Sequence, residues 1–390
     1  MLRTRSEHTS SRVTTVELFF DLVFVFAVTQ LSHRLLAHLD GLGAIQTALL
    51  LVAVWWVWIY TSWVTNWLDP DSTPVRFMLF GLMLAGLVLS ASIPEAFESR
   101  ALAFAGAYVV MQVGRSLFML WALRGHSETN FRNFQRITAW LSLSGAFWIA
   151  GAVADGDARL AIWALAMSTE LISPSVGFWV PGLGRSMTAE WDVEGGHMAE
   201  RCGLFIIIAL GESILVTGAT YADLIWSGET IAGFVAAFVG SVAMWWIYFN
   251  IGAERASHLI GRSVDPGRIA RVAYTYVHLP LVAGIIVSAV ADDLVLKHPH
   301  EHATAKTTAV LVGGPALYLI GNLLFKWVTA GWPPLSHLVG LALLIGLVPV
   351  AAHVSVLSLG AATSLVLVVV AAWETISLQS EGRSRLEDDG

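Results

Sequence analysis

The sequence predicts an all-α fold: a polytopic membrane protein of about twelve transmembrane helices in two parallel six-helix repeats. Of its 390 residues, 56% are hydrophobic and only 13% are charged, against about 45–50% and about 25% in soluble domains. Apolar runs long enough to cross a bilayer recur along the chain, and motifs of its first half return in its second half. One soluble core is excluded, because single cores stop growing near about 250–300 residues.

Each predicted span is an apolar run of about 20 residues, the length that crosses a hydrocarbon core of about 30 Å. The first half contains the runs 14–35, 43–65, 75–93, 101–123, 135–154 and 158–179. The second half contains the runs 199–220, 228–252, 270–291, 307–327, 335–354 and 356–378. We interpret the first run as a span and not as a cleaved signal, because Glu17 and Asp21 lie inside it.

Lys and Arg concentrate in alternate loops, which predicts that both termini lie in the cytoplasm. Arg124, Arg132 and Arg136 surround the loop between the fourth and fifth spans, whereas Glu95 and Glu98 mark the loop before it. Positively charged loops are retained on the cytoplasmic side. The loops that hold most of the basic residues are those on the same side as the two chain ends.

Three pairs of matching segments predict an internal repeat. Trp55-Trp56 of the second span returns as Trp245-Trp246 of the eighth, and Glu200 opens the seventh span as Glu17 opens the first. A Glu-x-Ile-Ser sequence occurs in both the sixth and the twelfth span, beginning at Glu170 near the middle of the sixth and at Glu374 toward the inner end of the twelfth. Because six spans are an even number, both halves enter the membrane in the same sense, which makes the repeat parallel.

The predicted organisation has five parts. They are a cytoplasmic basic tail 1–12, a first repeat 13–180, a cytoplasmic linker 181–198, a second repeat 199–378 and a cytoplasmic polar tail 379–390.

Ionisable residues inside predicted spans are candidates for function, because a charge at the centre of the bilayer costs at least about 2.5–3.5 kcal/mol and usually faces protein or a wet cavity. These candidates for binding or coupling a substrate or ion are Asp21, Arg115, Glu170, Glu212, Glu17, Glu374 and His278. Glu212 lies near the middle of the seventh span between Gly211 and Ser213, where a neighbouring helix or a ligand can approach closely. A carboxyl at that depth should be either protonated or paired.

Each candidate also has a purely structural interpretation. Glu17 can be a helix-start residue that interacts with the helix dipole, and Arg115 can be a static ion-pair partner of Asp21 or Glu170. His278 can be a packed, hydrogen-bonded histidine, and the side chain of Glu374 can extend to the membrane surface.

Several functional classes are excluded or disfavoured. The net charge of −7 argues against a nucleic-acid partner, and the lone Cys202 leaves no internal disulfide. The sequence contains no GxxxxGK[ST], HExxH, CxxC or GxSxG motif. We therefore expect no catalytic residue, no cofactor and no bound metal, and we expect that the protein is not an enzyme.

Two segments carry a resemblance to a known family. Val16 to Ala27, with Gln30-Leu31-Ser32-His33 after it, is similar to the opening signature of the bacterial low temperature requirement protein A family. Glu200 to Leu210, with Gly211-Glu212-Ser213-Ile214 after it, resembles the second motif of that family. The resemblance covers about residues 13–378 and implies a multi-pass protein of the bacterial plasma (inner) membrane. It implies no particular reaction.

Three functions remain open from the sequence. The first is a secondary transporter or an ion- or proton-conducting protein, with its substrate handled where the two halves meet. The second is a structural or sensory membrane protein whose buried charges form static pairs. The third is a membrane enzyme or redox protein, although haem needs two facing histidines and only His278 is well placed. The expected partners are the lipid bilayer and an unknown small solute, proton or ion.

Overall fold

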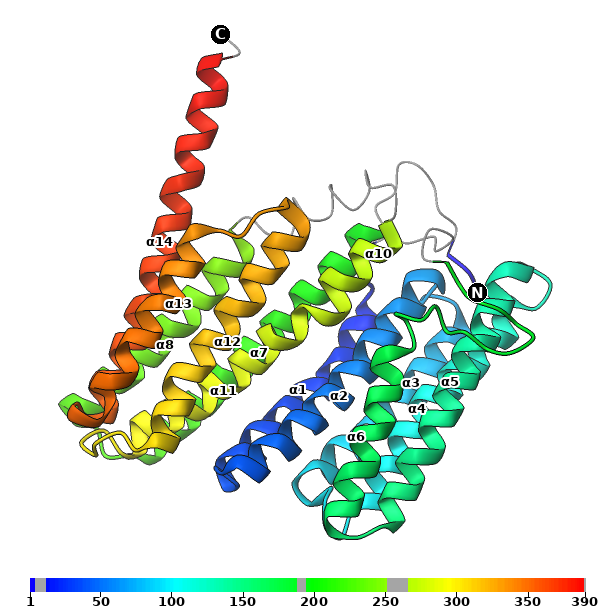
Figure 1. Cartoon of the computed structure of the whole chain (residues 1–390), viewed down its shortest axis with the longest axis horizontal. Coiled ribbons are helices and arrows are strands. Elements are labelled where there is room, and N and C mark those ends of the chain that lie inside the picture. The colour runs from blue at the N-terminus through cyan, green and yellow to red at the C-terminus, as the bar shows by residue number, and fades with distance from the viewer. Residues whose placement is uncertain (4–11, 188–193, 251–265, 389–390) are drawn as a thin grey trace. The chain divides into compact units, whose positions relative to one another are not determined.

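The computed structural model describes residues 1–3, 12–187, 194–250 and 266–388 (Figure 1). These residues are almost entirely helical, and ten of the described helices are long and apolar enough to cross a membrane. The prediction of an all-α polytopic membrane protein is therefore confirmed. Parts of the predicted tails 1–12 and 379–390 and of the linker 181–198 lie outside the described residues.

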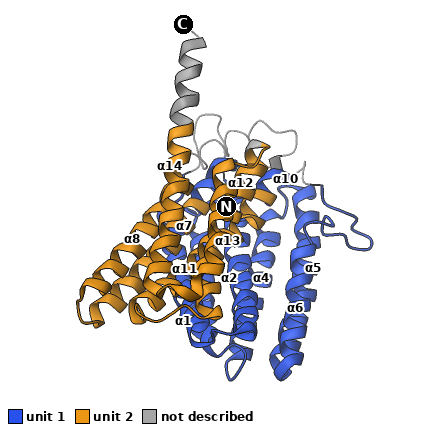
Figure 2. Cartoon of the chain, turned by 60° about the vertical axis from the view of Figure 1, so that its left-hand side comes forward, with its two compact units in different colours: residues 1–201, 260–271 blue, residues 202–259, 272–390 orange. Residues whose placement is uncertain are grey.

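The chain divides into two compact units, which Figure 2 shows in different colours. Unit 1 comprises residues 1–201 and 260–271, and unit 2 comprises residues 202–259 and 272–390. The division falls inside α7 (Gly195–Asp223), so the first turns of this helix belong to unit 1 and the rest to unit 2.

Unit 1 contains six long helices in its first segment: α1 (Thr15–Ala37), α2 (Gly41–Trp67), α3 (Thr73–Ser92), α4 (Ala101–Leu123), α5 (Glu128–Val153) and α6 (Gly156–Ile172). A short 3₁₀ turn, Ile93–Glu95, extends α3. Local sequence fixes where the helices begin: the Asp40 side chain caps α2 by accepting from the Gly43 N–H at 2.8 Å, and Pro74 occupies the first turn of α3. Helix α1 packs on α2 and α3, and α3 to α6 pack in sequence order, with α2 against α4 and α6.

Unit 2 contains the rest of α7 together with α8 (Gly228–Phe249), α11 (His278–Lys297), α12 (Ala305–Ala330), α13 (Leu335–Leu347) and α14 (Val356–Asp388). Helix α13 continues into a 3₁₀ turn, Val348–His353. Helices α11 to α14 pack in sequence order, and α8 packs on α11, α12 and α14. Hydrogen bonds from Ser213 and Thr220 attach α7 to α11.

The ninth predicted span is a composite helix. It starts with α10 (Pro266–Ala270), passes through a π-helical segment, Arg271–Tyr276, and ends as α11. Pro280 has no N–H to donate to the carbonyl of Tyr276, which is four residues earlier. Next to this gap the Val277 N–H donates to the Val272 carbonyl at 3.1 Å, one residue further back than in an α-helix.

A helix lies at each of the twelve predicted spans, but two of these helices differ from the others. Helices α5 and α6 are not among the ten candidate spans. The 17 residues of α6 extend about 25 Å, which is short of a hydrocarbon core of about 30 Å. The predicted run 158–179 overestimated this helix, because α6 ends at Ile172 and turns follow it.

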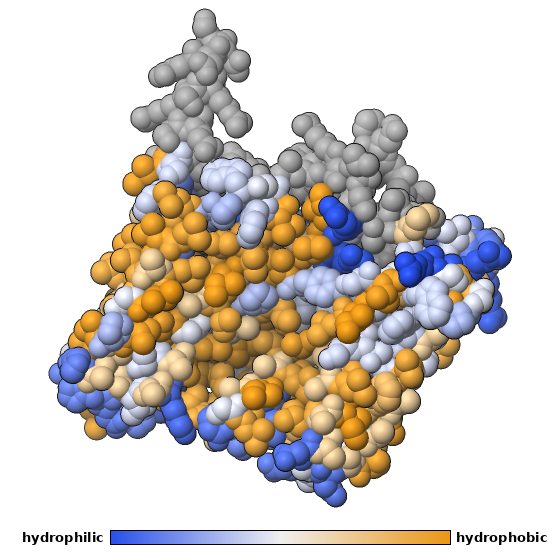
Figure 3. Space-filling model, in the orientation of Figure 1, coloured by the Kyte–Doolittle hydropathy of each residue, from blue (hydrophilic) through white to orange (hydrophobic). Residues whose placement is uncertain are grey.

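Large apolar side chains are exposed along the helices of both units. In Figure 3, hydrophobic side chains cover the lengths of the helices and hydrophilic ones collect near the helix ends. Leu84 in α3 is 68% exposed and Leu365 in α14 is 62% exposed. Exposing such apolar surfaces to water is unfavourable, whereas contact with the hydrocarbon chains of lipids is not.

Candidate functional site

The carboxylate of Glu170 is the centre of a buried cluster in unit 1. It accepts hydrogen bonds from the Tyr108 hydroxyl at 2.8 Å and the Gln112 amide at 2.7 Å, both on α4. It also accepts from the Ser144 hydroxyl at 2.6 Å and the Trp148 indole at 3.2 Å, both on α5. All four donors are neutral. Glu170 lies in the last turn of α6 and not in the middle of a span, because the helix is shorter than predicted.

Arg115 contacts this cluster through an amide. Its guanidinium donates to the Gln112 side-chain oxygen, and Gln112 in turn donates to Glu170. The same guanidinium donates to the Val57 carbonyl at 3.1 Å and the Thr61 hydroxyl at 2.8 Å on α2. Gln112 therefore lies between Arg115 and Glu170, in place of the direct ion pair that the sequence allowed.

Asp21 has a cationic partner that sequence reasoning missed. The Arg201 guanidinium lies 2.9 Å from the Asp21 carboxylate, to which the Trp58 indole also donates at 2.8 Å. Both charged side chains are almost completely buried. Arg201 lies at the edge of the seventh predicted span, so its depth gave no signal. Its residue spacing from Asp21 gave none either, since 180 residues separate them.

Glu17 combines a helix-start role with ion pairing. Its carboxylate accepts from the Thr14 N–H at 2.9 Å, as a residue in the first turn of a helix can. It also contacts the Arg3 guanidinium at 3.2 Å and the His197 ring nitrogen at 2.9 Å. The structural interpretation of Glu17 therefore accounts for its contacts.

Glu374 occupies a similar polar cluster in unit 2. Lys326 on α12 contacts both carboxylate oxygens, at 2.7 and 2.6 Å, and His337 on α13 lies 3.4 Å from one of them. Lys326 also donates to the Ile247 carbonyl on α8 at 3.3 Å. Glu374 is thus paired inside the unit, and its side chain does not extend to the surface.

His278 is a packed histidine. One ring nitrogen lies 2.8 Å from the Tyr248 hydroxyl, the other 2.7 Å from the Ala273 carbonyl, and the ring meets Phe325 edge to face. Within the described residues no three His, Cys, Asp or Glu side chains form a group that could hold a metal ion.

The surroundings of Glu212 include an acid that the sequence analysis missed. Glu212 is only 2% exposed, and the hydroxyl of the next residue, Ser213, lies 3.3 Å from both the Asp292 carboxylate and the Ser241 hydroxyl. The predicted ninth span ended at residue 291, which assigned Asp292 and Asp293 to an outer loop. Helix α11 instead continues to Lys297 and carries both acids within it.

These features define a multi-pass helical membrane protein with charged clusters inside its helical units. Residues 12–372 match the sequence model of a known family, bacterial low temperature requirement A protein (LtrA). An uncharacterized protein of Rhizobium meliloti (strain 1021) is 42% identical over 382 residues, covering 97% of this chain and 93% of the relative. No solved structure matches. The chain belongs to the LtrA family.

Proposed function

We propose that this protein is a secondary transporter or an ion- or proton-conducting protein of the bacterial plasma membrane, with both termini cytoplasmic and no enzymatic activity. The observation that carries the proposal is a pair of similarly built acidic clusters, one in each unit. Buried ionisable groups in membrane helices are costly, and they mark ion and substrate pathways in many transporters.

The two acids are held by corresponding helices. Glu170 on α6 accepts from α4 and α5, and Glu374 on α14 is contacted by α12 and α13. Counted from the start of each six-helix half, these are the sixth, fourth and fifth helices in both cases. The fourth helices also share a spacing: Tyr108 and Gln112 are four residues apart, as are Tyr318 and Asn322.

The cations near the two acids, Arg115 and Lys326, also occupy corresponding positions in the two halves. Arg115 donates to the carbonyl of Val57, the residue directly after Trp55-Trp56. Lys326 donates to the carbonyl of Ile247, the residue directly after Trp245-Trp246. In each half a cation on the fourth helix thus binds the second helix at the same point of a repeated motif.

The order of helix packing also supports two six-helix repeats. The third to sixth helices of each half pack in sequence order, and the second helix of each half contacts the fourth and the sixth. We infer a duplicated bundle whose halves are parallel, since each would have an even number of spans.

The two clusters differ in the groups that bind the carboxylate, and this difference favours Glu170 as the residue that couples transport to a proton or ion. Lys326 binds Glu374 directly, whereas Glu170 accepts from neutral donors and is separated from Arg115 by Gln112. A carboxyl group held by neutral donors can gain or lose a proton without breaking an ion pair. We therefore assign the coupling role first to Glu170, with Glu212 as the next candidate.

Flux measurements in proteoliposomes test the proposal. Purified protein is reconstituted with a pH-sensitive dye inside, and proton and alkali-cation gradients are imposed. We expect the wild type to exceed empty liposomes and Glu170→Gln to lose most of this flux while folding normally, because the amide cannot exchange a proton. The exposed Glu128 supplies the control Glu128→Gln, which should behave as wild type. Flux no higher than in empty liposomes, or unaffected by Glu170→Gln, would contradict the proposal.

A static structural or sensory role is the second candidate, and the directly bonded pairs Asp21–Arg201 and Glu374–Lys326 favour it. The variant Glu374→Gln separates the two. A lower yield of folded protein with unchanged flux per folded molecule supports the structural role, and lost flux at normal yield supports transport.

A further inference from the structure

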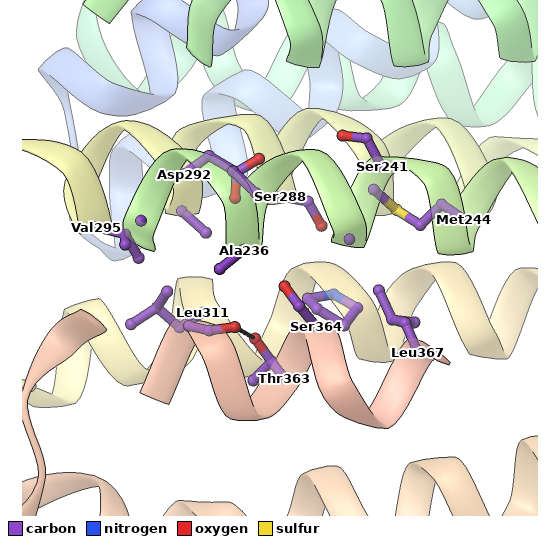
Figure 4. A pocket seen from close by; sticks show the side chains of 16 residues that line it. Ala236, Ser241, Met244, Ser288, Asp292, Val295, Leu311, Thr363, Ser364 and Leu367 are labelled. Atoms are coloured by element: carbon purple, nitrogen blue, oxygen red, sulfur yellow. Dashed lines mark hydrogen bonds between the residues drawn. The ribbon is translucent and has the colours of Figure 1, made fainter. Parts of the chain in front are cut away.

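We propose that unit 2 contains a binding site for one small monovalent cation, Na⁺, in a cavity beside Asp292. The cavity lies among α8, α11, α12 and α14 and is drawn in Figure 4. This site is independent of the clusters around Glu170 and Glu374, and binding to it is measurable whether or not the protein transports.

The size of the cavity suits a single small ion. Its volume is about 20 Å³, and about 10–15 Å³ is the least that holds one water molecule. A drug-sized ligand needs about 300–1,000 Å³. The cavity therefore has room for a small ion or for water and is too small for a drug-sized ligand.

Oxygen atoms from three helices line the cavity. Asp292 and Ser288 come from α11, Ser241 from α8, and Thr363 and Ser364 from α14. The Ser288 hydroxyl is buried and has no hydrogen-bond partner in the described residues, and Figure 4 shows its oxygen directed between the helices. An unpartnered buried hydroxyl is costly, and a bound ion would satisfy it.

A proline inside α12 frees one backbone carbonyl of a residue that lines the cavity. Pro315 lies inside α12 and lines the cavity together with Leu311, four residues earlier. Because proline has no N–H, the Leu311 carbonyl loses its helical hydrogen bond. Backbone carbonyls without a helical partner are ligands for Na⁺ where transmembrane helices are unwound in transporters, and we propose the same role for the Leu311 carbonyl.

The local charge selects a monovalent cation. Asp293 is neutralised by Lys297 at 2.9 Å and accepts from Thr220 at 2.7 Å. Asp292 accepts from Ser213 at 3.3 Å, and among the described residues no Lys, Arg or His forms an ion pair with it. One carboxylate with hydroxyl and carbonyl oxygens balances a single positive charge, whereas Ca²⁺ sites use 6–8 oxygen ligands and commonly several carboxylates.

Equilibrium binding of ²²Na⁺ to the full-length protein in detergent tests the site, with choline replacing Na⁺ to hold ionic strength constant. We expect saturable binding of one ion per chain and its loss in Asp292→Asn. Ser288→Ala should weaken binding about tenfold or more, because it removes one ligand of a charged group. Asp293→Asn is the matched control, since it removes the neighbouring acid and should leave the affinity unchanged.

Thermal unfolding provides a second readout. Na⁺ should raise the melting temperature of the wild type and of Asp293→Asn, but not that of Asp292→Asn. If Asp292→Asn does not fold, the weakened binding of Ser288→Ala carries the test. The proposal is overturned if the wild type shows no saturable ²²Na⁺ binding, as expected for a buried water only or a proton site. It is also overturned if both cavity variants bind as the wild type does.

Discussion

Single residues differ most in whether a buried charge has a charged partner. Asp21 and Glu374 each contact a cation directly, at 2.9 Å from Arg201 and 2.6 Å from Lys326. Glu170 accepts four hydrogen bonds from neutral groups. A directly paired acid resists any change of charge, because losing one charge strands the other. An acid such as Glu170, whose hydrogen-bond donors are all neutral, can change its charge without leaving a buried cation unpaired.

Asp21→Asn should lower the free energy of unfolding by about 3–5 kcal/mol, because it leaves the buried Arg201 uncompensated. Chemical or thermal unfolding in detergent measures this change. The exposed pair Arg76–Asp71 gives the control Asp71→Asn, for which we expect about 0–1 kcal/mol. Replacing both buried partners, as in Asp21→Leu with Arg201→Met, should recover part of the loss. Equal losses of unfolding free energy in Asp21→Asn and Asp71→Asn would contradict the prediction, because the buried pair would then stabilise the fold no more than the exposed pair.

At the level of helices, the closest packing in unit 2 is between α11 and α12. A Cβ atom built on Gly284 of α11 would lie 2.8 Å from the backbone Cα of Tyr318 on α12. A Cβ on Gly321 of α12 would lie 2.8 Å from the backbone N of Leu281. Small residues at such contacts let membrane helices approach one another closely.

Gly284→Ala should therefore destabilise unit 2 by about 1–3 kcal/mol, since backbone cannot move aside as a flexible side chain can. Gly313→Ala on α12 is the matched control, because a Cβ there meets nothing within 4 Å. The control should be neutral or stabilising by up to about 1 kcal/mol, as expected for Gly to Ala in a helix. The unfolding midpoints of the two variants, measured in the same detergent, test this prediction. A Gly284→Ala protein as stable as Gly313→Ala would contradict the close contact between α11 and α12.

For the whole molecule, the decisive quantity is the number of membrane crossings. Ten described helices meet the length and composition of a span, while α5 and α6 do not. Both counts are even, so the side of the last residues alone does not separate them.

Reporter fusions separate the two counts. With twelve crossings and cytoplasmic termini, fusions after Ala96, His126, Asp155 and Asp388 should report outside, inside, outside and inside. Asp155 lies between α5 and α6, so an inside signal there means that these two helices do not cross. An outside signal at Asp388 would remove the even count and with it the parallel repeat.

The sequence by itself showed that this is a membrane protein, where most of its helices lie along the chain, and to which family it belongs. These properties depend on local composition: a span is a run of apolar residues, and α4 occupies the predicted residues 101–123 from Ala101 to Leu123. Amphipathic stretches were harder to delimit. Helix α5 begins at Glu128, seven residues before the predicted start, because polar residues can extend a helix beyond its apolar run.

Only the tertiary structure decided which buried groups meet. Arg201 reaches Asp21 across 180 residues of sequence, and Gln112 lies between Arg115 and Glu170. Asp292 lines a cavity and does not lie in a loop, because α11 continues six residues beyond the predicted end at residue 291, to Lys297. Hydropathy gives the depth of a side chain, but its partners depend on how each helix is rotated and packed, and that follows from contacts summed over the whole unit.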